Sequence, residues 1–141
     1  IWQKSKGANA NFAWGSWLSA SNPVIRDIHE YCLVFSKDSM KNPSGGESTI
    51  EKNEFMESTL SIWNIKPEKA KKIGHPAPFP VELPKKFINL YSFKNDLVLD
   101  PFIGSGTTAI ASKLLHRNYV GYEINKDYIE IANKRLQIET S

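Results

Sequence analysis

The sequence predicts an α/β fold with a parallel sheet, and three observations in its C-terminal half carry that prediction. An apolar run at residues 97–99 leads into a glycine turn, and an amphipathic segment at residues 109–115 follows it. A second strand-like run at residues 119–123 ends in an acid, and residues 127–138 repeat apolar side chains at helical spacing. Strand–helix–strand–helix order with short connections is typical of a parallel α/β unit.

The rest of the chain contributes less regular elements. We expect residues 1–4 to end a strand, residues 5–30 to form a long loop, residues 31–35 to form a buried strand, and residues 42–46 to turn. The following elements complete the prediction: a short helix at residues 52–59; a proline-rich stretch at 76–84 that cannot be helical throughout; a helix that starts near Pro84 with Phe87, Ile88 and Tyr91 on one face; and a final helix capped by Asn125 or Asp127.

The glycine turn is the most informative motif of the chain. It is made of Asp100, Pro101, Phe102, Ile103, Gly104, Ser105, Gly106, Thr107 and Thr108. Two glycines with one residue between them let the backbone turn sharply and approach a ligand. The N–H groups of the new helix then face that ligand. Glu123, at the end of the next strand, is placed to accept hydrogen bonds from a ribose. The pattern predicts a nucleoside-containing cofactor.

The loop is open to three interpretations: it binds a dinucleotide, it is a phosphate-binding P-loop, or it binds S-adenosylmethionine. Residues 104–109 fit a loose dinucleotide pattern, and a phosphate-binding P-loop is weaker because no Gly-Lys-Ser/Thr follows. Asp100 separates these interpretations, because a carboxylate beside the glycines repels phosphates and attracts the ammonium and sulfonium of S-adenosylmethionine. The alternative is that Asp100 only caps a turn. Phe102 either lines the cofactor pocket or packs under the loop.

Asp-Pro-Phe-x-Gly-x-Gly-Thr-Thr resembles the cofactor motif of the DNA methyltransferases that modify adenine N6 or cytosine N4. Residues 75–84 are similar to a second cofactor-side segment of that family, and residues 13–17, 21–23, 26–27 and 29–37 resemble the border of its target-base pocket. The resemblance implies a Rossmann-like sheet that binds S-adenosylmethionine. It implies these cofactor-binding residues: His75, Pro76, Phe79, Asp100, Pro101, Phe102, Gly104, Ser105, Gly106, Thr107, Thr108 and Glu123.

The resemblance also implies three regions. Residues 1–37 border the target-base pocket, residues 38–72 form a DNA-recognition insert, and residues 73–141 form the cofactor-binding part. The resemblance and the basic run of the sequence together imply contacts with DNA or the target base from Trp14, Trp17, Ser21, Asn22, Lys66, Lys69, Lys71 and Lys72. The alternative for the lysines is a solvated surface, and for the tryptophans it is packing across the cleft.

The family's Asp/Asn/Ser-Pro-Pro-aromatic motif is absent from residues 1–141, so the catalytic residues stay unknown. That motif polarises the target amine and stacks on the extruded base. In the permuted order it lies upstream of Ile1, and the chain looks like the C-terminal half of a methyltransferase. We therefore expect a sheet that is incomplete without upstream strands, a partner segment that fills it, and no activity from the chain alone. Adenine and cytosine stay equally open as targets.

Composition sets broad limits. A net charge of +3 is consistent with contact to double-stranded DNA, and a mean hydropathy of −0.40 argues against a membrane protein. The single cysteine, Cys32, is expected in the core, and no histidine spacing predicts a metal site. We expect a cytoplasmic, site-specific DNA methyltransferase of the restriction–modification type. A non-catalytic cofactor- or nucleic-acid-binding subunit and a nicotinamide-dependent oxidoreductase are the alternatives.

Overall fold

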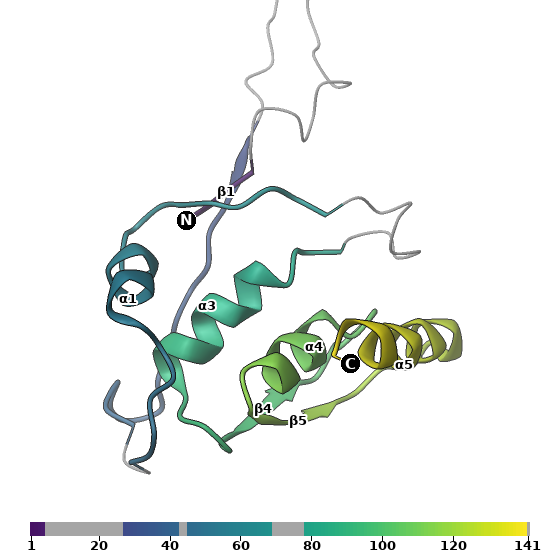
Figure 1. The fold of residues 1–141 in the computed structure, drawn as a ribbon. Helices are drawn as coiled ribbons and strands as arrows, with labels where there is room; N and C mark the ends of the chain where they lie inside the picture. The colour runs from purple at the N-terminus through teal and green to yellow at the C-terminus, as the bar shows by residue number, and fades with distance from the viewer. Residues whose placement is uncertain (5–26, 43–44, 69–77, 141) are drawn as a thin grey trace, which may run out of the picture.

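The computed structural model describes residues 1–4, 27–42, 45–68 and 78–140 (Figure 1). The elements are β1 (Trp2–Gln3), β2 (His29–Glu30), α1 (Lys52–Ser58), β3 (Trp63–Asn64), α3 (Glu82–Tyr91), β4 (Leu97–Asp100), α4 (Thr107–Leu114), β5 (Asn118–Gly121) and α5 (Lys126–Glu139). The following predicted site residues lie outside the described residues: Trp14, Trp17, Ser21, Asn22, Lys69, Lys71, Lys72, His75 and Pro76.

The predicted parallel unit is confirmed. Strands β4 and β5 pair in parallel with Leu97 opposite Asn118 and Asp100 opposite Gly121. Helix α4 connects them and lies over one face of the pair, as Figure 1 shows. Ala109, Ile110 and Ala111 of α4 have no exposed surface. These small and branched side chains let the helix approach the sheet closely, which places the loop before α4 at the carboxyl ends of both strands.

The predicted helices on either side of this unit are also confirmed. Helix α5 starts after Asn125, whose side chain accepts a hydrogen bond from the Asp127 N–H at 2.9 Å, so the cap is Asn125. Helix α3 holds Pro84 in its first turn, where the missing proline N–H has no intrahelical acceptor to lose. Ile88 of α3 is buried and α3 packs against α4.

A second small sheet forms around β1, which pairs antiparallel with β2 and parallel with β3. Trp2 anchors it, with 4% of its surface exposed and its indole N–H donating to the Ile65 carbonyl at 2.8 Å. Helix α1, predicted at residues 52–59, precedes β3 and packs against α3. The prediction that the chain begins with part of a strand is confirmed by β1.

The predicted buried strand at residues 31–35 is wrong. The strand in this region is β2, at residues 29–30, and the apolar residues that follow it are largely exposed, with Leu33 at 73% and Phe35 at 84%. A strand exists only when its backbone pairs, and β1 pairs only with residues 29–30 of this segment. Cys32, expected in the core, is only half-buried for the same reason.

The two sheets are separate: within the described residues, no strand hydrogen-bonds to both. Side chains connect α3 and the segment before α1 to the β4–β5 unit. Buried Arg117, just before β5, donates to the Ser92 carbonyl at 2.7 Å and to Thr49 Oγ1 at 2.5 Å. Thr49 in turn donates to Asn89 of α3 at 3.0 Å. Burial lowers the pKa of the Arg117 guanidinium, and Asp96 partly opposes this shift. No described helix is long and apolar enough to cross a membrane.

Candidate cofactor site

The glycine loop leaves β4 and enters α4 through two left-handed residues. Gly104 has a φ of 50° and Gly106 a φ of 82°, a region that side-chain-bearing residues adopt only with strain. The chain after β5 holds the loop in place, because the Tyr122 N–H donates to the Asp100 carbonyl and the Ile103 N–H donates to the Tyr122 carbonyl, each at 3.0 Å. These bonds extend the parallel pairing beyond the ends of β4 and β5.

Part of the need for glycine is internal packing. A Cβ on Gly106 would lie 2.8 Å from the Cβ of Ala132 in α5, and a Cβ on Gly121 would lie 2.9 Å from the Cβ of Ile103. Neither separation occurs between real side chains, so larger residues would push the loop away from α5 or from the end of β5. Glycine here serves the close approach of helix and strand as well as the turn.

The two predicted acids lie at the carboxyl ends of neighbouring parallel strands. Asp100 Oδ1 accepts a hydrogen bond from the Phe102 N–H at 2.9 Å, so the turn-capping role weighed for it is present. Glu123 Oε2 accepts from the Gly104 N–H at 3.1 Å, and its Oε1 accepts from the Asn125 N–H at 2.8 Å. An ionised carboxylate offers about four lone-pair positions, so both acids keep acceptor capacity for a ligand.

Apolar side chains stand exposed beside these acids. Phe102 is 87% exposed, so the alternative that it packs under the loop is wrong. Ile124, the residue after Glu123, is fully exposed, and Tyr122 is 63% exposed. Sequence reasoning did not select Ile124, although an apolar residue directly after a strand-end acid was a usable signal. The site therefore offers both carboxylate oxygens and uncovered apolar surface, the mixture that a nucleoside-containing ligand requires.

The hydroxyl-bearing loop residues behave differently from one another. Ser105 and Thr107 are 4% and 3% exposed, and both side chains bond to Arg135 of α5. Thr108 is half-buried. Arg135 was not selected as a site residue from the sequence. Its signal was a charged residue on the same helical face as Ile131, Ala132 and Leu136.

The remaining predicted site residues that are described lie less centrally. Pro101 is exposed beside Phe102, Phe79 is half-buried before α3, and Lys66 is exposed after β3.

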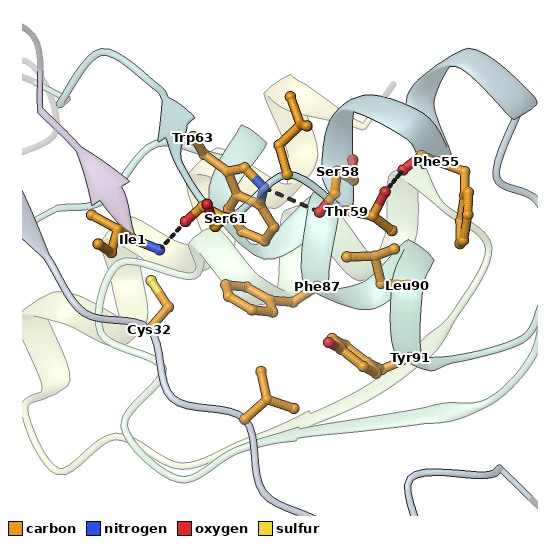
Figure 2. Close-up of a pocket in the computed structure, with 12 residues that line it drawn as sticks. Ile1, Cys32, Phe55, Ser58, Thr59, Ser61, Trp63, Phe87, Leu90 and Tyr91 are labelled. Carbon is orange, nitrogen blue, oxygen red and sulfur yellow. Dashed lines mark hydrogen bonds between the residues drawn. The ribbon is translucent and has the colours of Figure 1, made fainter.

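An apolar cavity of about 380 Å³ lies elsewhere, between residues 32–34, α1, β3 and α3 (Figure 2). Phe87 and Tyr91 of α3 line it and also line a second cavity of about 450 Å³ under residues 33–42.

Comparison with known proteins gives this geometry a family. The chain matches the N6_N4_Mtase DNA methylase family over residues 1–134. The type II methyltransferase M.BglI of Bacillus subtilis is 34% identical over 145 residues, which cover 97% of this chain and 37% of that protein. The type II methyltransferase M.MjaI of Methanocaldococcus jannaschii is 33% identical over 150 residues, which cover 99% of this chain and 48% of that protein. The chain thus spans less than half the length of either relative.

Two solved structures are similar in fold. A putative DNA modification methylase from Thermus thermophilus, complexed with S-adenosyl-L-methionine, matches with a TM-score of 0.55 and 34% identity over 66% of this chain and 35% of that one. The PvuII DNA methyltransferase, described as cytosine-N4-specific, matches with a TM-score of 0.51 and 26% identity over 60% of this chain and 34% of that one. With the family match across nearly the whole sequence, these findings show that the chain belongs to the N6_N4 DNA methylase family.

Proposed function

We propose that this chain is the cofactor-binding portion of a site-specific DNA methyltransferase. The reaction transfers a methyl group from S-adenosylmethionine to an exocyclic amino nitrogen of adenine or cytosine. The observation that carries the proposal is the glycine loop between Asp100 and Glu123, at the carboxyl ends of two parallel strands. Membership of the DNA methylase family and the methyltransferase names of the relatives support it and favour neither alternative, the non-catalytic subunit or the oxidoreductase.

The residues of the site fit this cofactor. Glu123 keeps free lone pairs for the ribose hydroxyls while its bonds to the backbone fix its orientation. Asp100 supplies negative charge for the ammonium and sulfonium. Exposed Ile124 and Phe102 supply apolar contact for the adenine ring and the aliphatic part of the ligand. S-adenosylmethionine supplies an activated methyl group, and these side chains hold and orient it.

The groups that polarise the target amine belong, in this proposal, to an upstream segment or a partner chain. That segment also completes the sheet. Leu97 and Leu99 of β4 are 65% and 62% exposed, although both faces of a parallel sheet are normally covered. Leu33 and Phe35 stand exposed beyond β2, and the cavity shown in Figure 2 is lined mainly by apolar side chains. A chain segment that pairs with β2 and β4 and also packs across their uncovered faces would cover Leu33, Phe35, Leu97 and Leu99.

The DNA-facing parts follow from the same proposal. Residues 38–72 contact the DNA sequence, residues 1–37 border the target base, and residues 73–141 hold the cofactor. Helix α1 supports an outward-facing role for the middle segment, because its Met56 is 59% exposed. The same segment is anchored on α3, where Glu54 accepts from the Asn89 amide at 2.9 Å. The DNA-recognition segment is thus attached to the helix that packs on α4.

Calorimetric titration of the complete protein that carries this chain tests the proposal. We expect binding of S-adenosylmethionine and S-adenosylhomocysteine and no binding of NAD. Tight NAD binding would overturn the proposal. The matched variant is Asp100→Asn, which keeps the acceptor for the Phe102 N–H and removes the charge. This variant should weaken the binding of S-adenosylmethionine, whose sulfonium is positive, more than the binding of S-adenosylhomocysteine, whose sulfur is neutral.

A further inference from the structure

Arg135 of α5 holds the glycine loop through its guanidinium. Its Nη1 donates to the Ser105 carbonyl at 2.9 Å, to Ser105 Oγ at 3.1 Å and to Thr107 Oγ1 at 3.1 Å. Its Nε donates to Glu139 Oε1 at 2.8 Å. Only 12% of its side chain is exposed. A single guanidinium therefore joins three acceptors of the loop to a helix that starts after the second strand.

We propose that Arg135 is a positioning residue for cofactor binding, which acts through the loop and does not contact the ligand. This inference rests on the proposed cofactor site. Ser105 and Thr107, selected from the sequence as cofactor-binding residues, turn their hydroxyls toward Arg135 and are almost fully buried. Their side chains thus contribute to the shape of the loop and are not exposed to a ligand.

The loop needs the contact with Arg135 because its glycines alone do not fix its backbone conformation. Gly104 and Gly106 are the residues with the most backbone freedom to lose on folding, and they flank Ser105. Glu123 holds Gly104, Ala132 closes against Gly106, and Arg135 holds the residue between them. A loop held at three successive residues keeps one backbone arrangement, which lowers the entropy lost when a ligand binds.

The guanidinium shape matters as well as its charge. Arginine spreads its donors over a rigid fork, so Nε reaches Glu139 while Nη1 reaches the loop. A lysine offers one compact ammonium and cannot keep both sets of contacts. The ion pair with Glu139 is partly exposed and lies one helical turn away, so it contributes little by itself. Glu139→Gln is therefore the matched control.

The experiment uses the complete protein with Arg135→Met, Arg135→Lys and Glu139→Gln. Titration with S-adenosylhomocysteine gives the cofactor Kd, and methylation kinetics give the cofactor KM and kcat separately. We expect Arg135→Met to raise cofactor Kd and KM about tenfold, because the loop then loses the bonds that hold it in its binding arrangement. kcat at saturating cofactor and the Kd for DNA should stay within about twofold of wild type. Arg135→Lys should restore part of the affinity, and Glu139→Gln should match wild type.

The outcomes separate this inference from the function on which it rests. A wild-type protein that binds no S-adenosylhomocysteine overturns the proposed function. If wild type binds and Arg135→Met binds equally well, or loses DNA and cofactor affinity in parallel, the positioning role is overturned. Should Arg135→Met fail to fold, Thr107→Val and Arg135→Lys replace it in a double-mutant cycle. The two changes should be less than additive in cofactor affinity, and full additivity would overturn the proposal.

Discussion

The carboxylate of Glu123 accepts a hydrogen bond from the Gly104 N–H at 3.1 Å, across 19 residues of chain. Its other oxygen accepts from the Asn125 N–H at the start of α5. One side chain thus fixes the glycine loop against the end of β5 and presents its remaining lone pairs outward. Loop geometry and ligand binding are coupled at this residue, and substitutions there act on both.

Substitution of Glu123 should therefore weaken cofactor binding, by different amounts in two variants. Glu123→Gln keeps the side-chain length and one carbonyl acceptor, whereas Glu123→Ala removes both acceptors. We expect the alanine variant to lose roughly 1–3 kcal/mol of S-adenosylhomocysteine affinity, the scale of hydrogen bonds to a charged acceptor, and the glutamine variant to lose less. Calorimetric titration of the complete protein measures both. An unchanged affinity in the alanine variant would remove Glu123 from the site.

Replacement of Gly106 by alanine should destabilise the fold by about 2 kcal/mol or more. The cost combines a left-handed φ of 82° with a Cβ placed 2.8 Å from Ala132. Gly45→Ala is the matched control, because Gly45 has a φ of 63° and nothing within 4 Å of its added Cβ. It should cost about 1 kcal/mol, from backbone strain alone. Urea denaturation compares the two, and equal losses would show that the contact with α5 is unimportant.

The sequence predicted the elements of the cofactor unit well because their signals are local. The cap at Asn125 and the apolar spacing of α5 lie within one helix, and the glycine turn lies between adjacent elements. The strand predicted at residues 31–35 failed because pairing depends on a partner distant in sequence. Apolar composition alone does not supply that partner, and Phe35 stays exposed.

The site, like the fold, was predictable where its residues carry local signals. Asp100 ends β4 and Glu123 follows β5, both were selected from the sequence, and the structure brings them to the carboxyl ends of the paired strands. Arg135 was missed because its bonds to Ser105 and Thr107 span 30 and 28 residues, and its place on the apolar face of α5 does not identify those partners. The inward direction of those two hydroxyls was equally invisible, since a glycine-rich motif specifies backbone shape and not which side chains are buried.

Residues 1–141 alone should transfer no methyl group to DNA, even with cofactor present. The sequence holds no Pro-Pro-aromatic motif to accept the amino hydrogens of the target base. A tritiated-methyl assay on DNA with unmodified target sites measures this. Addition of the upstream segment, in cis or as a partner chain, should restore transfer and reduce dye binding at the exposed Leu97 and Phe35 surfaces. Incorporation by residues 1–141 alone would mean that the catalytic groups lie within them.

The choice of DNA sequence should depend on residues 39–63 and not on Lys66, Lys69, Lys71 and Lys72. Replacement of residues 39–63 by the matching segment of a relative should change which sites are methylated, because base contacts discriminate between sequences. Cofactor affinity should stay the same, since the glycine loop lies outside the exchanged segment. Sequencing of methylated sites and titration with S-adenosylhomocysteine check the two expectations. An unchanged site preference would place sequence recognition elsewhere.

Neutralising Lys66, Lys69, Lys71 and Lys72 together should weaken binding to every DNA sequence. Phosphate contacts add affinity without discrimination, because the backbone is the same at every site. The dependence of log Kd on log salt should flatten by about 0.9 for each lysine–phosphate pair that the substitutions remove. The control neutralises Lys113 and Lys134, which are exposed on α4 and α5, and should change the slope less per lysine. If the four-lysine variant keeps the full wild-type slope, those lysines are a solvated surface, and the phosphates are bound by other residues.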